Sequence, residues 1–312
     1  MLRKSKGVLQ VLENAANSEV KEYYENSNVR KEISVFCRRR WVAIHCEKKS
    51  PQGVPFLVRY KGWKRKAPLT IDGEEDVTKL LNLFSRLSPR TFYGTINEYK
   101  TLENPEELDD LDNIERSTAI WDIDNLPDDW ETTIRVARLI LEFLHDNGVK
   151  KSAFIKWSGN GAHVHLNPLA VSDDTYLRIG PLNIAYAIVE YTIRSLKPQF
   201  RKLVESLKSI NLNVENKIDP KRIFTAPLSL HRNLFRACVC VLPEDIDNFE
   251  ISWTNPTTFR HDPNWTRTLN GEADPLAELA YSKIGPCPYT GRLFRTKTSP
   301  LDTGRQPSQV PS

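Results

Sequence analysis

The sequence predicts an α+β fold in which a mixed, largely antiparallel β-sheet is flanked by helices. Three features predict it: short apolar or β-branched runs typical of strands, longer segments with helical apolar spacing, and turn-forming residues between them. The tight turn SGNG (158–161), which joins the predicted strands 151–157 and 162–168, is the clearest of these connections.

Composition limits the classes of protein to which the chain can belong. Its 312 residues are 39% hydrophobic and 27% charged, which suits one large or two small soluble domains. No apolar run approaches the ~20 residues that span a membrane, and the amino terminus lacks the apolar core of a signal peptide. The net charge of +4 permits a polyanionic partner without requiring one.

The five cysteines are odd in number and lack the paired CxxC spacing of a zinc site. Cys238 and Cys240 lie in the apolar stretch RACVCVLP, where two small buried residues on a strand are the simplest interpretation. We therefore expect reduced thiols, no zinc site and a cytoplasmic location.

The first hundred residues alternate between helix and strand. Residues 8–35 look helical and charged, and residues 74–87 have helical apolar spacing up to Pro89. Strands are expected at 40–47, 55–60 and 90–99, and a solvated acidic connector at 103–115.

The middle of the chain is more regular. The predicted strand 117–124 leads through NLPDDW into an amphipathic helix that ends at Gly148. A long helical region at 173–209 is expected to be interrupted near Pro198. Further strands are expected at 151–157, 162–168, 216–219, 222–227 and 235–242. The predicted organisation is an N-terminal region at 1–88, a core at 89–283, and a disordered tail at 284–312.

Two aspartates stand in the stretch STAIWDIDNL (117–126), whose first eight residues are the predicted strand 117–124. Asp122 and Asp124 are two residues apart, so a strand projects both carboxylates from the same face. Like charges this close repel each other unless a cation lies between them. An apolar strand is a costly place for two unpaired carboxylates, which favours a functional role over a solvated edge or a helix cap.

The turn SGNG follows the next strand and suits an anion. Its two glycines allow positive φ, which leaves N–H groups free to face a phosphate, and Ser158 adds a hydroxyl donor. His163 follows on the emerging strand, with His165 on the same face. A plain β-hairpin turn is the alternative interpretation, and His165 is interpreted as a packed, hydrogen-bonded residue.

These motifs, in this order, resemble those of the archaeo-eukaryotic primase superfamily. AIWDIDNL (119–126) is similar to its first motif, SGNGAHV (158–164) to its second and NKIDP (216–220) to its third. The segment RIFTAPLSLHRN (222–233) is similar to the one that follows the third acid in primase small subunits, which are the catalytic subunits. The resemblance implies a primase-type catalytic core within residues 89–283.

The resemblance also implies a function, DNA-templated nucleotidyl transfer by a primase or primase-polymerase that synthesises or extends primers on single-stranded DNA. Asp122, Asp124 and Asp219 would be catalytic and would hold two Mg²⁺ or Mn²⁺ ions, since oxygen-only ligands select these metals. The substrates would be NTPs or dNTPs. The protein itself would lie in the cytosol, associated with the nucleoid. A primase large subunit or a helicase is a partner that the resemblance allows.

The nucleotide is expected at the second motif and at the segment after the third acid, where arginine supplies a permanently charged clamp. The predicted nucleotide-binding residues are Ser158, Gly159, Asn160, Gly161, His163, Arg222, Ser229, His231 and Arg232.

Template binding is expected where basic residues alternate with tryptophan. The predicted residues are Arg38, Arg39, Arg40, Trp41, Trp63, Lys64, Arg65 and Lys66. For residues 61–68 a solvated basic loop is an equally good interpretation, and one or two of the arginines at 38–40 can pair with carboxylates instead.

Other functions stay open on the sequence alone. An end-joining repair polymerase belongs to the same superfamily. A non-catalytic single-stranded nucleic-acid-binding protein would explain the basic tryptophan stretches but would not need three acids. A metal-dependent phosphohydrolase or nuclease would also use clustered acids, but it more commonly adds a metal-binding histidine and needs no triphosphate pocket.

Overall fold

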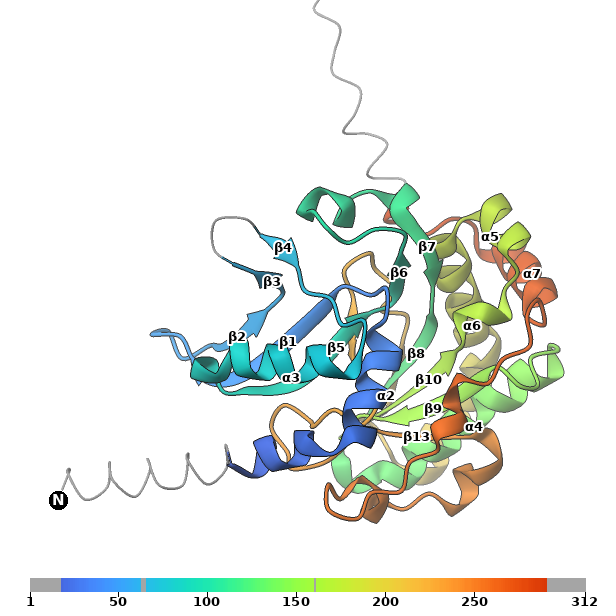
Figure 1. The fold of residues 1–312 in the computed structure, drawn as a ribbon. Helices are drawn as coiled ribbons and strands as arrows, with labels where there is room; N and C mark the ends of the chain where they lie inside the picture. The colour runs from blue at the N-terminus through green and yellow to red at the C-terminus, as the bar shows by residue number, and fades with distance from the viewer. Residues whose placement is uncertain (1–17, 63–65, 160, 291–312) are drawn as a thin grey trace, which may run out of the picture.

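The computed structural model describes residues 18–62, 66–159 and 161–290 of the chain. It is an α+β protein built on two main β-sheets, with helices packed against each of them (Figure 1). The predicted fold class is confirmed, although the strands form two main sheets rather than one.

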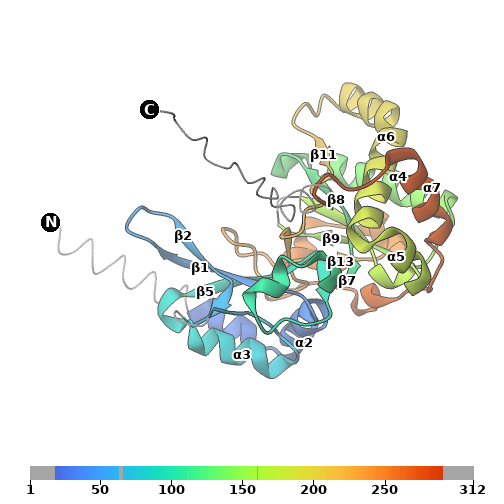
Figure 2. The same cartoon turned by 90° about the horizontal axis from the view of Figure 1, so that it is seen from above.

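The first sheet has four strands in the order β12-β5-β1-β2, all paired antiparallel. Its strands are β1 (Val42–Lys49), β2 (Pro55–Val58), β5 (Pro89–Thr95) and β12 (Ile223–Thr225). The helices α2 (Ser27–Cys37) and α3 (Glu74–Leu83) lie together on one side of it (Figure 2). The side chain of Asn26 caps α2, and acidic residues in the first turn of α3 suit its helix dipole.

The second sheet has five strands in the order β11-β8-β10-β9-β13, again all antiparallel. Its strands are β8 (Ala119–Asp124), β9 (Ala153–Trp157), β10 (Ala162–Leu166), β11 (Asn213–Glu215) and β13 (Val239–Val241). Four helices lie on its outer side (Figure 2), namely α4 (Trp130–Asp146), α5 (Asp173–Ile179), α6 (Pro181–Leu207) and α7 (Asp274–Ile284). The apolar stripe of α4, with Ile140 and Leu144 fully buried, packs against β8 and β10.

Shorter elements complete the chain. Two small antiparallel pairs form, β3 (Tyr60–Lys61) with β4 (Ala67–Pro68) and β6 (Asn97–Tyr99) with β7 (Ile114–Ser117). The predicted acidic connector between β6 and β7 contains two 3-10 turns, Pro105–Leu108 and Leu111–Asn113. Other 3-10 turns are Ser85–Leu87, Pro127–Asp129, Pro168–Ala170, Pro243–Asn248, Ile251–Thr254 and Pro263–Thr266.

The two main sheets share a buried junction. Lys156 Nζ of β9 lies 4.2 Å from the ring centroid of Phe36 on α2, and the His163 ring of β10 lies 4.8 Å from that of Phe224 on β12. The chain also connects the sheets. Along the sequence, β11 and β13 belong to the second sheet, whereas β12, which comes between them, belongs to the first. The predicted boundary between residues 88 and 89 falls where β5 begins, and β5 pairs with β1 of the predicted N-terminal region.

Two predicted elements differ from the structure. The long helical region breaks at Gly180, which has a φ of 93°, and Pro181 then occupies the first position of α6. The helix continues through Pro198. Pro198 leaves the carbonyl of Arg194 without its helical partner, and both residues are exposed. Residues 216–219 form a loop rather than a strand, since β11 ends at Glu215.

The predicted helix at 8–35 is described from residue 18 onward and is helical on both sides of Asn26. All five cysteines are buried and free of disulfides. None of the described helices is both long enough and apolar enough to cross a membrane. Residues 291–312, most of the predicted tail, lie outside the described residues.

Candidate active site

Asp122 and Asp124 lie at the end of β8, in the interior of the second sheet. β8 is flanked by β10 and β11, and Asp122 stands opposite His163 on one side and Glu215 on the other. Asp122 is buried, with 5% of its surface exposed, whereas Asp124 at the strand end is exposed. Both carboxylates nevertheless reach the same cation, as their spacing in the strand predicts.

That cation is the ammonium group of Lys217, in the loop after β11. Its Nζ lies 2.7 Å from Asp122 Oδ2, 2.8 Å from Asp124 Oδ2 and 2.8 Å from Glu215 Oε2. Burial lowers the pKa of Lys217, but its hydrogen bonds to the three carboxylates outweigh burial and hold the pKa above its ordinary value. Sequence reasoning missed Lys217 and Glu215, for which the only signal is the acid and lysine two residues apart in VENKID.

His163 makes the other contact with Asp122. Its Nε2 lies 3.0 Å from Asp122 Oδ1. Burial raises the pKa of Asp122, but hydrogen bonds from His163 and Lys217, together with their charges, lower it far below its ordinary value. Asp122 is therefore ionised at neutral pH.

His165 is a packing residue, as the sequence predicts. It is fully buried and its ring stacks on that of Phe154, with the centroids 4.9 Å apart. The predicted hydrogen bonds are absent, because neither ring nitrogen has a partner within the described part of the chain.

The SGNG turn folds back onto β8. The N–H and hydroxyl of Ser158 both donate to the Gly161 carbonyl, at 3.0 and 3.2 Å, so this hydroxyl is used inside the turn. Gly159 has a φ of 128°, and a Cβ there would lie 2.8 Å from the His231 ring. A Cβ on Gly161 would lie 2.6 Å from the carbonyl oxygen of Ile123. The two glycines therefore permit close approach to the segment that carries His231 and to β8.

His231 lies against this turn as a neutral donor. Its Nδ1 accepts hydrogen bonds from the N–H groups of Asn233 and Leu234, at 3.2 and 3.1 Å, which leaves the proton on Nε2. The pKa of His231 is lowered to about 4 by burial and by the charges of three nearby arginines, Arg232, Arg90 and Arg236.

Two of these arginines were not predicted. Arg236 Nη1 donates to the Gly159 carbonyl at 3.3 Å. Arg90 donates to the carbonyls of His231 and Leu234, at 2.9 and 3.0 Å, and so fixes the loop 231–234. The predicted Arg232 is exposed beside them. Positive charge therefore adjoins the turn on the side of His231, whereas the carboxylate of Asp124 lies near Gly161.

Ser229 was predicted to bind the nucleotide but lies in the core. It is fully buried, and its hydroxyl oxygen accepts the Phe92 N–H at 2.7 Å and lies 3.2 Å from the Tyr24 hydroxyl. The structure does not bring Ser229 into the site, because its hydroxyl ties this segment to β5.

Arg222 and Asp219 border the site on its other side. Arg222 Nη2 lies 3.5 Å from Asp122 Oδ2. Asp219 is not among the carboxylates around Lys217, and its Oδ1 accepts the Lys221 N–H at 2.8 Å. Within the described ranges, no three Asp, Glu, His or Cys side chains are close enough to hold a metal ion. The predicted third acid therefore adjoins the aspartate pair without completing a metal site.

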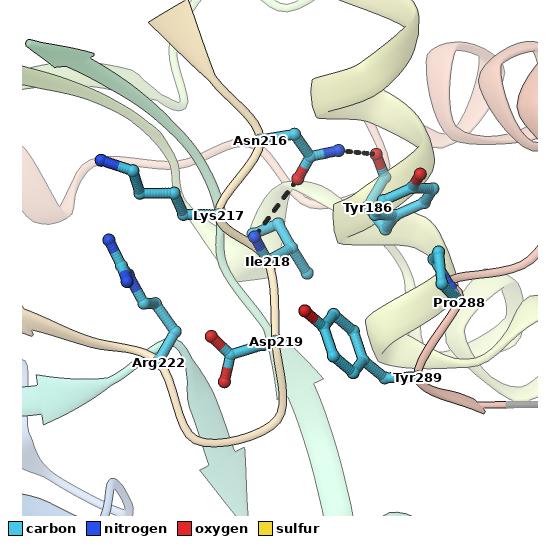
Figure 3. Close-up of a pocket in the computed structure, with 8 residues that line it drawn as sticks. All are labelled: Tyr186, Asn216, Lys217, Ile218, Asp219, Arg222, Pro288 and Tyr289. Carbon is cyan, nitrogen blue, oxygen red and sulfur yellow. Dashed lines mark hydrogen bonds between the residues drawn. The ribbon is translucent and has the colours of Figure 1, made fainter. Parts of the chain in front are cut away.

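A pocket of about 360 Å³ opens beside Asp219 (Figure 3). It lies between α6, the loop after β11 and the C-terminal segment at 288–289, and it shares Lys217 and Arg222 with the carboxylate cluster. Its lining residues are Tyr186, Asn216, Lys217, Ile218, Asp219, Arg222, Pro288 and Tyr289.

Most of the predicted template-binding residues at 38–41 are engaged within the protein. Arg40 is buried, pairs with Glu98 at 2.9 Å and donates to two backbone carbonyls near the end of β5. Trp41 is buried too, and its Nε1 donates to a backbone carbonyl at 2.8 Å. Arg39 pairs with Glu115, which is the alternative that the sequence left open.

The remaining predicted residues divide into two groups. Arg38 and Lys66 are exposed and accessible to a nucleic acid. Trp63, Lys64 and Arg65, like Asn160 of the glycine turn, lie outside the described residues.

The fold and the site define an α+β protein with carboxylates, a glycine turn and arginines gathered at one end of a sheet. No protein-family model and no curated protein matches the sequence. Among solved structures, the chain is similar to the polymerase domain from Mycobacterium tuberculosis Ligase D in complex with DNA. The two chains are 14% identical, the TM-score is 0.49, and the match covers 89% of this chain and 91% of that one.

Proposed function

We propose that the chain is a DNA-templated nucleotidyltransferase of the primase or primase-polymerase type, which synthesises or extends primers on single-stranded DNA. The observation that carries this proposal is the convergence of Asp122, Asp124 and Glu215 on one cation position beside the SGNG turn. Nucleotidyl transfer needs acids that hold a cation and positive groups that hold a triphosphate. Acids and arginines that could serve these two roles lie together at one end of the second sheet.

Divalent ions are implied by this chemistry, and the aspartate pair offers the carboxylate oxygens that such ions bind, although no three acids of the described residues form a metal site as they stand. The Lys217 ammonium is a stand-in that three carboxylate oxygens hold at 2.7 to 2.8 Å, and Mg²⁺ and Mn²⁺ prefer such oxygen-only ligands. Asp122 and Asp124 would hold the metal, with Asp219 as the third acid and Glu215 as the alternative. When bound, such ions neutralise triphosphate charge and lower the pKa of the attacking 3′-hydroxyl.

The chain's own residues would bind and orient the nucleotide. His231 and Arg236 adjoin the glycine turn, which supports a role for their N–H groups as donors to the triphosphate. Arg222 would clamp a phosphate next to Asp122. The hydrogen bond from His163 supports a positioning role, in which the histidine holds the Asp122 carboxylate in one orientation.

One incubation tests the proposal. The full chain is mixed with a single-stranded DNA template, labelled NTPs or dNTPs and Mn²⁺, with and without an annealed primer, and the products are sized. Extended primers or new oligonucleotides are the expected result. A shortened template would instead indicate a nuclease, and a mobility shift without synthesis a nucleic-acid-binding protein.

The same incubation separates the two polymerase types. Synthesis without a primer supports priming. Products that appear only when two DNA ends are supplied together would favour the end-joining polymerase over the primase.

A further inference from the structure

We propose that the pocket of Figure 3 binds the nucleoside that supplies the attacking 3′-hydroxyl, either the last residue of a primer or a single initiating nucleotide. This inference rests on the proposed function and adds the second substrate to it.

The pocket and the glycine turn lie on opposite sides of β8. In the sheet, β8 has β10 on one side and β11 on the other. The SGNG turn leads into β10, whereas the loop that carries Asn216 and Asp219 continues from β11. The strand with Asp122 and Asp124 therefore lies between the glycine turn and the pocket, and Arg222 stands at the edge of the pocket nearest Asp122.

In-line attack at phosphorus suits this arrangement. The 3′-oxygen forms a bond to the α-phosphorus, the bond from that phosphorus to the pyrophosphate oxygen breaks, and the hydroxyl proton passes to solvent. The attacking and leaving oxygens lie roughly in line on opposite sides of the phosphorus. If pyrophosphate leaves toward the glycine turn, the hydroxyl arrives from the side of β11, where the pocket opens.

The lining of the pocket suits a nucleoside. Tyr186 and Tyr289 supply aromatic surface on which any base can stack, and in Figure 3 the Tyr289 ring extends toward Asp219. Asn216 is fixed, because it donates to the Tyr186 carbonyl at 3.1 Å and accepts the Ile218 N–H at 3.3 Å. The volume of about 360 Å³ falls within the range of about 300–1,000 Å³ found for small-ligand sites.

Tyr289 reaches the pocket on an anchored segment. The Oδ1 atom of Asn183 on α6 accepts the Cys287 N–H at 3.0 Å and the Thr290 hydroxyl at 3.2 Å. Cys287 is itself buried, so the backbone on both sides of Tyr289 is fixed to α6. Tyr289 as a whole residue remains 42% exposed, which leaves it accessible to a base.

Fluorescence of a base analogue tests this placement without turnover. A primer–template carries 2-aminopurine at the 3′ end of the primer, and no nucleotide is added, so only binding is measured. We expect the full chain to quench the fluorescence of this terminal base by stacking on it. Tyr289→Ala should weaken the binding measured in this way by about 5- to 100-fold, because one stacking contact is lost. Tyr289→Trp should restore quenching. Leu279→Ala, an exposed change on α7, should match the wild type.

Kinetics give the second readout. Tyr289→Ala should raise the KM for the primer and leave the KM for the incoming nucleotide unchanged. If Tyr289→Ala also raises the KM of the initiating nucleotide in synthesis without a primer, the pocket binds a lone nucleotide as well. If the variant raises only the KM of primers, the pocket binds a primer end.

The outcomes separate the two proposals. If the wild type incorporates nucleotides while Tyr289→Ala keeps its terminal quenching and primer KM, the pocket assignment is wrong and the proposed function stands. A rise in nucleotide KM alone would overturn the assignment as well. Terminal quenching that depends on Tyr289 without any incorporation would overturn the proposed function instead.

Discussion

His231 is held as an uncharged hydrogen-bond donor next to the glycine turn. Its Nδ1 is occupied by two backbone N–H groups, and its pKa of about 4 keeps the ring neutral from pH 6 to 8. If Nε2 donates to the triphosphate, His231→Ala should raise the nucleotide KM by about tenfold or more and change kcat little. Steady-state kinetics at pH 6, 7 and 8 should give the same increase at each pH.

The matched control is His145→Ala, because this histidine is exposed near the end of α4 and lies outside the site. A loss of kcat at unchanged KM in His231→Ala would contradict the role in ground-state binding.

The choice between Asp219 and Glu215 as third acid can be made with isosteric amides. Asp219 stands with Arg222 at the edge of the pocket, whereas the Glu215 side chain is 42% exposed and paired with Lys217. We expect Asp219→Asn to abolish nucleotide incorporation and Glu215→Gln to reduce it by less than about tenfold, the scale of a surface ion pair. Incorporation rates and Mn²⁺ titrations of both variants measure this. The opposite order would transfer the role to Glu215.

At the scale of single residues, sequence reasoning succeeded where geometry is local. The spacing of Asp122 and Asp124 is enough to bring both carboxylates to one cation. Lys217 could not be predicted, because the pairing of β11 with β8 brings together segments about 90 residues apart. Arg40 and Trp41 were assigned to the template because a basic aromatic stretch has the same composition whether it is exposed or, as here, buried.

Among the elements, the SGNG turn is constrained most by its contact with β8. A Cβ on Gly161 would lie 2.6 Å from the Ile123 carbonyl oxygen, and backbone on both sides leaves little room to shift. Gly161→Ala should lower the free energy of unfolding by about 1 to 3 kcal/mol, as overpacking does, and weaken nucleotide binding more than template binding. Thermal unfolding and separate nucleotide and template titrations measure both effects.

Gly73→Ala is the matched control, because nothing lies within 4 Å of a Cβ there and the backbone is extended. An equal loss of nucleotide and template affinity in Gly161→Ala would indicate general disruption of the hairpin rather than damage to a phosphate site.

The predicted secondary structure is wrong where the effects of a proline and a glycine on a helix were misjudged. Pro198 was expected to interrupt the long helix, yet the break is at Gly180, where a positive φ ends α5 and Pro181 begins α6. The glycine signal was present in the sequence. An interior proline removes one backbone hydrogen bond and can kink a helix without ending it, and the sequence does not show which of the two will happen.

At the scale of the whole molecule, the junction of the two sheets encloses a lysine. Lys156 is fully buried, and its Nζ has no hydrogen-bond partner among the described residues. Burial lowers the pKa of Lys156 to about 8, an effect that nearby thiols partly offset. The titratable and charged groups that face it are Cys37, Arg40, His163, His165, Cys238 and Cys240.

This burial predicts a pH-dependent stability. Between pH 8 and about 10.5 the unfolded chain keeps the Lys156 proton that the folded chain has lost, so the free energy of unfolding should rise with pH. Lys156→Met should remove that rise and increase the free energy of unfolding at pH 7 by about 1 to 3 kcal/mol. Urea denaturation at pH 7 and 10 measures both, with the exposed Lys151→Met as control. A less stable Lys156→Met protein at pH 7 would show that the amine is favourably paired.

The carboxylates at the end of β8 are central to the proposed nucleotidyl transfer, and one substitution addresses them most directly. Incorporation of labelled nucleotide on a primed single-stranded template is measured for the wild type, for Asp122→Asn, and for Asp112→Asn in the exposed acidic connector. Thermal unfolding checks that all three are folded. We expect Asp122→Asn to lose incorporation by orders of magnitude while Asp112→Asn keeps the wild-type rate. Wild-type incorporation by a folded Asp122→Asn protein would contradict the proposed active site.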